Sequence, residues 1–243
     1  MVDLTAKTVR EILVESPTTT EIFEEFKIDY CCGGDRLFAD ACQAAGVEPP
    51  IVADKIEEAL AKPDGGIELP ERKNASDLIK YIIDKHHVFT REQIVRLSAL
   101  MERVCGKHLQ QHAELGDLRQ AFATLCNDLV FHLKKEETVL FPYIMELEKA
   151  RIESRPATAA PFGSVNDSAR SLRWEHEEAS NILRKMRRIS FEYALPEDAC
   201  PSFQALYFGL QELEKDLHQH IHLENNVLFP LAAKMEGETA FGD

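Results

Sequence analysis

Basic residues are scarce in this chain of 243 residues. Lysine and arginine together number 28 against 42 aspartate and glutamate residues, which gives a formal net charge of −14. A surface for nucleic acid or for an anionic membrane needs clustered lysine and arginine. The composition therefore predicts a soluble, acidic protein with no nucleic-acid partner.

Long apolar runs are also missing. No stretch approaches the roughly 20 apolar residues that cross a bilayer, and the opening segment contains Asp3 and Glu11 without an apolar core. We therefore expect neither a membrane span nor a secretory signal peptide. The six cysteines follow no regular framework, at positions 31, 32, 42, 105, 126 and 200. Because 44% hydrophobic residues build a core without disulfides, we predict a reducing, cytoplasmic environment.

The chain contains a duplicated unit. Two stretches share the pattern His-x-x-x-Glu-x-x-Val-Leu-Phe-Pro, with every shared position 88 residues apart: His132, Glu136, Val139, Leu140, Phe141 and Pro142, then His220, Glu224, Val227, Leu228, Phe229 and Pro230. One further histidine precedes each stretch: His87 comes before the first and His176 before the second, and the two are 89 positions apart. Each unit therefore predicts a helix with one histidine, followed by a helix with a histidine and a glutamate.

The repeated pairs point to metal chemistry. Residues four apart lie on one helical face, so each imidazole and carboxylate can address one ion. Two helical hairpins predict a four-helix bundle, whose core is a common place for a paired iron or manganese site. The candidate ligands are His87, His132, Glu136, His176, His220 and Glu224. Iron suits these donors, while manganese and zinc stay open. A single pair would favour a core group or an ion pair, but its repetition favours metal.

Five other histidines receive structural or surface interpretations. Consecutive helical residues do not share a face, so only one of His86 and His87 is expected to face the core, and the spacing favours His87. His218 and His222 are predicted to point away from the ligand face into solvent. For His108 and His112, surface positions are favoured over a second, weak metal site.

Domain boundaries follow the composition. Segment 63–74 carries proline, glycine and many charges, which is typical of a linker. It separates a predicted small helical domain over 1–62 from a predicted bundle over 75–240. Asn74 is expected to cap the first bundle helix, with Asp77 at its third position.

Helical periodicity gives the bundle helices their predicted extents. The first is expected to run from the Asn74 cap to about residue 104, with a break at Gly106. The others are expected over 112–150, 169–193 and 202–236. Because proline disrupts a helix interior, bends are predicted at Pro142 and Pro230.

The N-terminal domain also looks helical, and nothing in it alternates with the period of two that strands require. Thr18 and Glu21 have the spacing of a capping box, and a second helix is expected just after Gly34. Cys31 and Cys32 precede that helix, whose N-terminus would lower a thiol pKa. The alternative is two small apolar residues packed under a short helix.

The Cys-Cys-Gly-Gly segment at 31–34, combined with the two His-x-x-x-Glu-x-x-Val-Leu-Phe-Pro units, resembles the di-iron proteins of the repair of iron centres family, which repair iron–sulfur clusters. The resemblance covers essentially the whole chain. It implies an all-α protein with a hemerythrin-like four-helix bundle after a small helical domain. It also implies two non-haem iron ions, bridged by an oxo or hydroxo group. Glu136 and Glu224 would bridge them, with terminal ligands His87, His132, His176 and His220.

The resemblance implies repair of clusters damaged by nitric oxide or oxidative stress, by iron donation or nitric oxide handling. Damaged or apo iron–sulfur proteins would be the partners, and Cys31 and Cys32 a thiol site that receives iron or nitric oxide. Two positions depart from relatives. Ser180 stands where oxygen-carrying hemerythrins have a further ligand, and Cys105 where many repair proteins have a histidine. Accessory roles for Cys105 and His108 stay open.

Two other classes of function compete with repair. One is a sensor or binding module in which oxygen or nitric oxide occupies open metal positions, and the other is a di-iron reductase of nitric oxide or peroxide. The Cys-Cys-Gly-Gly segment favours repair, and the absence of a DNA-binding or signalling segment weakens the sensor. Enzymatic activity, and the choice between monomer and homodimer, stay open.

Overall fold

The computed structural model describes Leu4, residues 6–60 and residues 74–240. Apart from Asn74, the predicted linker at 63–74 lies outside the described residues. Helices dominate the described ranges, which contain no strand, and the one β contact among them is an isolated bridge between Thr8 and Leu37. The predicted all-α fold class is confirmed.

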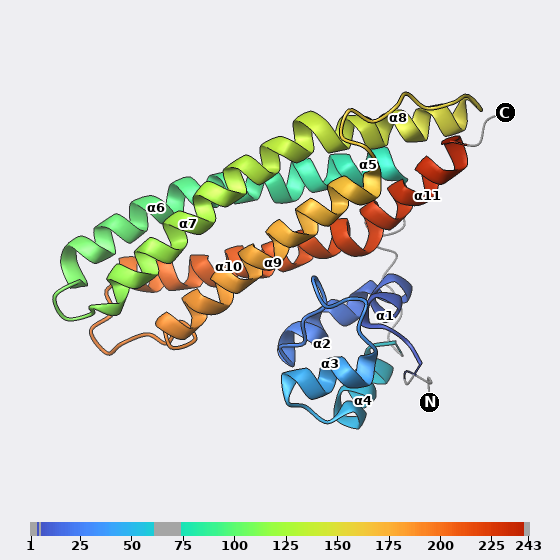
Figure 1. The fold of residues 1–243 in the computed structure, drawn as a ribbon. Coiled ribbons are helices and arrows are strands. Elements are labelled where there is room, and N and C mark those ends of the chain that lie inside the picture. The colour runs from blue at the N-terminus through green and yellow to red at the C-terminus, as the bar shows by residue number, and fades with distance from the viewer. Residues whose placement is uncertain (1–3, 5, 61–73, 241–243) are drawn as a thin grey trace. The chain divides into compact units, whose positions relative to one another are not determined.

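The chain divides into two compact units. One comprises Met1–Lys80, Ile144–Ala159 and His218–Asp243, and the other comprises Tyr81–Tyr143 and Ala160–Leu217. The helices found mainly in the first unit are α1 (Val9–Glu15), α2 (Thr20–Glu25), α3 (Phe38–Ala45), α4 (Pro49–Leu60), α5 (Ala75–Tyr81), α8 (Phe141–Ile152) and α11 (Phe229–Ala240) (Figure 1).

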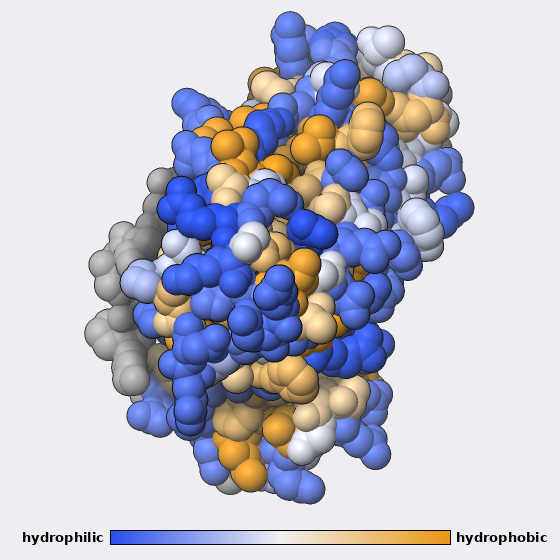
Figure 2. Space-filling model, turned by 90° about the vertical axis from the view of Figure 1, so that its left-hand side faces the viewer, coloured by the Kyte–Doolittle hydropathy of each residue, from blue (hydrophilic) through white to orange (hydrophobic). Residues whose placement is uncertain are grey.

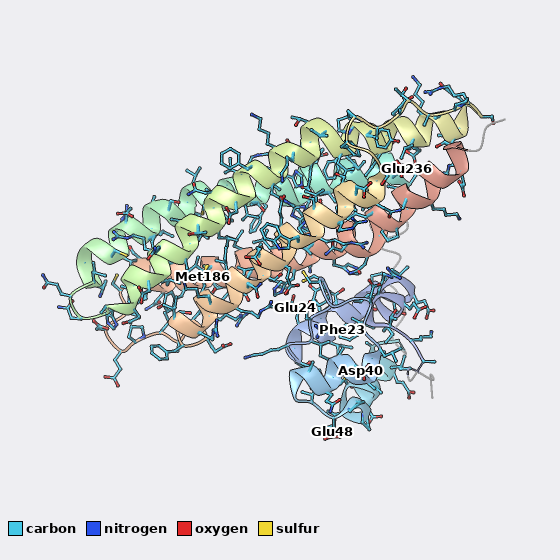
Figure 3. All side chains as sticks on the ribbon, in the orientation of Figure 1. Phe23, Glu24, Asp40, Glu48, Met186 and Glu236 are labelled. Atoms are coloured by element: carbon cyan, nitrogen blue, oxygen red, sulfur yellow. The ribbon has the colours of Figure 1, made fainter. Side chains whose placement is uncertain are left out.

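The second unit contains helices packed as a four-helix bundle. Its members are α6 (Val88–His108), α7 (Glu114–Lys135), α9 (Val165–Ile189) and most of α10 (Pro201–His222), which run alongside one another in Figure 1. Fully buried leucines from three of them, Leu97, Leu125 and Leu210, share one core with Met186 of α9 (Figure 3). Burial of each such side chain contributes about 1.5–3 kcal/mol, which fixes the helices that carry the predicted ligands.

A separate core holds the short N-terminal helices together. Phe23 is fully buried there and Tyr30 almost fully, among side chains from α1, α3 and α4 (Figure 3). A capping box begins α1, where Thr8 accepts from the Glu11 amide and the Glu11 carboxylate accepts from the Thr8 amide. Ile221 of α10 also belongs to this core, so residues far along the chain complete the packing of the short N-terminal helices.

The capping box predicted at Thr18 and Glu21 is wrong. The N-cap of α2 is Thr19, which makes no side-chain capping bond. A 3₁₀ turn over Pro17–Thr19 leads directly into the helix, and the Thr19 amide donates to the Ser16 carbonyl. Because that turn already satisfies the first amides, the helix needs no separate cap.

Helix extents in the bundle differ from prediction in two places. The break at Gly106 is wrong, since α6 continues to His108 and Gly106 faces open space, where a helical glycine costs only about 1 kcal/mol relative to alanine. The third helix lies four residues earlier than predicted, over Val165–Ile189. It starts early because the Ser164 hydroxyl caps the Asp167 amide.

The predicted cap of the first bundle helix is confirmed. The Asn74 side chain accepts from the Asp77 amide at 2.8 Å and donates to the Asp77 carboxylate at 2.9 Å. The buried Glu148 carboxylate of α8 accepts from the Ala75 and Ser76 amides at 2.9 and 3.0 Å. A carboxylate at this positive helix end is stabilising, so α5 is anchored to α8.

No helix among the described residues is long and apolar enough to cross a membrane. The face drawn in Figure 2 is covered largely by hydrophilic residues, with smaller groups of hydrophobic residues between them (Figure 2). That pattern is ordinary for a protein surface that faces water.

Candidate metal centre

Three helices that carry predicted ligands widen into π-helical turns. These turns are η3 (Ile82–His87), η4 (Glu136–Leu140) and η5 (Leu223–Leu228). His87 ends the first, Glu136 begins the second, and Glu224 lies in the third. Turns of this kind are rare and are frequent at functional sites. Two of them come directly before the Phe-Pro steps, where the bends at Pro142 and Pro230 were predicted.

The second unit brings three predicted ligands together. One side-chain ligand atom each from His132, Glu136 and His176 lies within 4.8 Å of the other two. The Nε2 atoms of His132 and His176 are 3.0 Å apart, and all three residues are buried. Donor atoms converge here at the separations that coordination of one ion requires.

Glu136 is the centre of this group. Its side chain is fully buried, and neither carboxylate oxygen accepts a hydrogen bond from a residue that the structure describes. His132 Nε2 lies 3.2 Å from one oxygen, and His87 Nε2 lies 3.5 Å from the other. A buried carboxylate without compensation is costly, so this arrangement calls for protons or a cation between nitrogen and oxygen.

The outer nitrogens of the same histidines face carboxylates. His87 Nδ1 donates to Glu137 at 2.6 Å, and His132 Nδ1 donates to Glu175 at 2.9 Å. With Nδ1 holding the proton, the inner Nε2 of a neutral imidazole presents a lone pair toward Glu136. Histidines that bind metals are oriented in this way by carboxylates, so the geometry fits a cation.

The orienting carboxylates are held in their charged form. The hydrogen bond from His132 lowers the pKa of Glu175 to about 2, with help from Lys135. Burial raises the pKa of Glu137, but hydrogen bonds from His87 and Arg91 outweigh burial, so this pKa lies below its usual value. Both groups therefore remain acceptors at neutral pH.

The first unit contains the other predicted pair. His220 Nε2 lies 3.0 Å from Glu224 Oε1, and both side chains are buried. The pair repeats the arrangement of His132 and Glu136, where the corresponding atoms are 3.2 Å apart. The duplicated sequence thus produces duplicated local geometry.

The Cys-Cys-Gly-Gly segment forms a tight bend. The Asp29 carboxylate accepts from the amides of Cys32 and Gly33 at 3.0 and 3.1 Å. It also lies 3.6 Å from the Cys31 sulfur, which is 4.0 Å from the Cys32 sulfur. Together Asp29, Cys31 and Cys32 offer donor atoms that could hold an ion.

The predicted lowering of a cysteine pKa is wrong for Cys31. The hydrogen bond with Cys32 and burial both raise its pKa well above the usual value, and the Asp29 charge adds to this. The next helix, α3, begins only at Phe38, so its N-terminus does not act on the thiols. A bound cation, by contrast, would favour the thiolate.

The same segment packs on the helix that carries His220 and Glu224. The side-chain amides of Asn225 and Asn226 donate to the carbonyls of Cys31 and Tyr30, at 3.1 and 3.0 Å. The Tyr30 ring packs edge-on against His222, with ring centroids 5.7 Å apart. Within the first unit, the cysteine segment is therefore attached at Asn225, the residue that follows Glu224.

Similarity to known proteins agrees with these sites. The Hemerythrin HHE cation binding domain matches residues 78–232, which include all six candidate ligands, and a domain of unknown function called ScdA_N matches residues 5–60. The iron–sulfur cluster repair protein YtfE of Musicola paradisiaca is 31% identical over 235 residues, covering 95% of this chain and 97% of the relative. The chain belongs to the iron–sulfur cluster repair family.

Other members of the family cover nearly the same extent. The iron–sulfur cluster repair protein ScdA of Staphylococcus haemolyticus is 28% identical over 221 residues, or 91% of this chain and 95% of its own. A probable iron–sulfur cluster repair protein of Haemophilus influenzae is 31% identical over 225 residues, or 90% of this chain and 93% of its own. The suspected resemblance is thereby confirmed, with a domain of the cation-binding type.

Two expectations about neighbouring histidines are wrong. His86 and His87 are both buried, because a bundle helix has neighbours on two sides, and His86 Nδ1 contacts Asp216 of α10 at 2.9 Å. His222 is also buried, with Nδ1 3.0 Å from the Asn226 amide nitrogen. The N-terminal segment covers it, and burial lowers its pKa to about 4.

Three residues whose roles the sequence left open, Cys105, Ser180 and His108, lie in the second unit. Cys105 is buried in the core of the second unit, where burial raises its pKa. Ser180 is buried on α9. His108 is buried as well, which contradicts a surface position, and its Nε2 lies 3.3 Å from the Cys200 sulfur.

Sequence reasoning missed the residues that support the ligands. Glu137 and Glu175 are direct neighbours of the ligands Glu136 and His176, so their adjacency was a usable signal. Asn225 and Asn226 stand where the first repeat has Glu137 and Thr138. A difference inside a duplicated motif could have marked them as specialised.

Proposed function

We propose that this protein repairs iron–sulfur clusters damaged by nitric oxide or oxidative stress, using two iron ions held in the bundle. Glu136 and Glu224 would bridge the ions, and His87, His132, His176 and His220 would be terminal ligands. Support comes from the family, from the 88-residue repeat and from the matching local geometry of both His/Glu pairs. By the same reasoning, iron–sulfur proteins with damaged or missing clusters would be the partners.

The observation that carries the proposal is the buried carboxylate of Glu136. Each oxygen faces an imidazole nitrogen whose ring is fixed by a carboxylate on the far side. An ion between these imidazoles and the carboxylate would supply the positive charge that a buried carboxylate requires. A bridging carboxylate has a separate oxygen for each of two ions, so the two sides of Glu136 suit two ions.

Bound iron would supply a place for nitric oxide or a reserve of metal for cluster rebuilding. The residues of the chain hold and orient it. Glu137 and Glu175 keep the protons on the outer nitrogens of His87 and His132. Phe141 stacks on the His87 ring, with centroids 5.6 Å apart, and keeps water from that side.

We further propose that Cys31 and Cys32 form the thiol site that receives iron or nitric oxide. Their segment is bonded to Asn225, next to Glu224, and the two sulfurs with Asp29 form one donor group. Binding of a ferrous ion by both thiols would release two protons. The raised pKa of Cys31 then keeps the thiol protonated until metal arrives.

The first test is iron per chain, with the near-ultraviolet spectrum, before and after anaerobic incubation with an apo iron–sulfur protein. Two irons at the start, falling as the client regains its cluster, is the expected result. Two irons that stay in place would redirect the function toward sensing or reduction, and absence of iron after growth in iron-replete cells would refute the site.

The thiol site has a separate test. The Cys31→Ala, Cys32→Ala double variant should keep its iron but lose repair of a client treated with nitric oxide. Cys42→Ala is the matched control, because this buried cysteine belongs to the same small domain but lies outside the donor group. Full repair by the double variant would remove the thiols from the mechanism.

A further inference from the structure

A second group of metal-binding side chains lies in the four-helix unit. His108 is the last residue of α6, and His112 follows in the turn toward α7. Asp198 and Cys200 precede the start of α10 at Pro201. One ligand atom each from His108, His112 and Asp198 lies within 4.8 Å of the other two, so two histidines and a carboxylate share one place.

Each histidine turns one nitrogen toward Asp198. His112 Nε2 lies 2.9 Å from Asp198 Oδ1, and His108 Nδ1 lies 3.7 Å from Asp198 Oδ2. The other nitrogens face acceptors: His112 Nδ1 lies 3.0 Å from Glu114, and His108 Nε2 lies 3.3 Å from the Cys200 sulfur. An acceptor behind each imidazole fixes which nitrogen presents its lone pair, as at His87 and His132.

The acceptor role of Cys200 is consistent with its place. Backbone amides at the start of α10, above all that of Phe203, lower the pKa of the Cys200 thiol. A sulfur that accepts a hydrogen bond from His108 Nε2 leaves Nδ1 directed at Asp198. The Phe203 ring packs against both histidine rings, with centroids 5.3 and 5.6 Å away, which restricts their rotation.

The competing interpretation is a network of ion pairs that ties the turn after α6 to the start of α10. His112 lies between two carboxylates. Burial lowers the pKa of His112, but the hydrogen bonds to Asp198 and Glu114 outweigh burial, so this pKa lies above its usual value. A proton can therefore occupy Nε2 in place of a metal. His108, however, points at the second oxygen of the same carboxylate, so both imidazoles converge on one group as ligands of a shared ion do.

We propose that His108, His112 and Asp198 form a second site for a divalent transition-metal ion, independent of the His/Glu groups. Two histidines and one carboxylate with open positions match zinc(II) sites with bound water and iron(II) sites of the facial type. The Asp198 side chain is 53% exposed, so an ion here exchanges with solvent. Binding displaces the proton on His112 Nε2, so affinity rises with pH.

The test is metal titration of the full-length, iron-loaded protein by calorimetry, with zinc(II) in air and iron(II) under anaerobic conditions. We expect one further ion per chain with at least one of the two metals. His112→Gln and Asp198→Asn should each weaken it about tenfold or more, consistent with loss of one of three ligands. Glu197→Gln is the matched control, with the same loss of charge on the neighbouring exposed residue.

A further variant separates the proposed ligands from a residue that only positions them. Glu114→Gln should weaken binding less than His112→Gln does, because it only positions the imidazole. Unchanged iron content and melting temperature in each variant confirm that the fold is intact. If no further ion binds, or if His112→Gln and Asp198→Asn bind it as tightly as the natural chain, the group is an ion-pair network only and the proposal is overturned.

Discussion

The two copies of the repeated motif keep the same histidine and glutamate but differ on the outside of the helix. Among the positions that change between the copies are Lys134, Glu137 and Thr138, which become His222, Asn225 and Asn226. In the first copy, the lysine and threonine are exposed and Glu137 orients His87. In the second copy, all three residues are buried and two of them bond the N-terminal segment.

The difference separates two tasks between the copies. If both pairs bind metal as proposed, the same chemistry constrains both, which agrees with the match of His132 and Glu136 to His220 and Glu224. The outward faces differ: the first copy supplies Glu137, which orients His87, and the second copy attaches the cysteine segment. Variants that act on one face only should therefore affect only one task.

The largest effect is expected where the copies agree. Glu136→Ala or Glu224→Ala should each remove most of the bound iron, since each carboxylate would contact both ions. The measurement is iron per chain with the absorption of the bridged pair. His87→Ala or His176→Ala should affect mainly one ion. Unchanged iron and absorption in either glutamate variant would contradict the bridging role.

Support of the first copy by a carboxylate predicts the next effect. Glu175→Gln keeps the shape but weakens the orientation of His132, and such changes typically cost about 10–100-fold in metal affinity. Competition with an iron chelator measures the loss. Glu177→Gln on the same helix is the control, because Glu177 pairs with Arg184 instead. Equal affinity of the two variants would remove Glu175 from the site.

Attachment of the N-terminal segment predicts a smaller effect. The double change Asn225→Glu, Asn226→Thr gives the second copy the outward residues of the first. Loss of two hydrogen bonds at about 1 kcal/mol each should raise the alkylation rate of Cys31 about tenfold or more, followed by mass spectrometry. Iron content should stay constant, and unchanged labelling would show that the asparagines do not hold the segment.

The smallest effect is expected from the reverse substitution, which changes the first copy toward the second. Thr138→Asn places the asparagine in the first copy, where the side chain is exposed and bonds only to the Lys134 carbonyl among described residues. The free energy of unfolding in urea should change by no more than about 0.5 kcal/mol. A loss above 1 kcal/mol would mean that the first copy also has a partner on this face.

Much of this architecture could be predicted from residue spacing. The all-α class followed from helical periodicity, and the ligand pairs followed from the 88-residue repeat. Burial of His86, His108 and His222 could not, because a periodicity gives one favoured face whereas a bundle helix contacts several neighbours. The pKa of Cys31 also depended on a bend that Asp29 closes through backbone amides, which no residue pattern in the segment indicated.

The π turns affect the direction in which the buried residues of a helix point. Buried residues recur every four positions through η4 and η5: His132, Glu136, Leu140 and Ile144, then His220, Glu224, Leu228 and Ala232. In a straight α-helix with 3.6 residues per turn, each step of four drifts by about 40°. A π turn holds the extra residue and cancels that drift. In these two helices the candidate ligands and the apolar residues beyond them thus keep one direction, and deleting one residue from either turn would rotate the rest of the helix by about 100°.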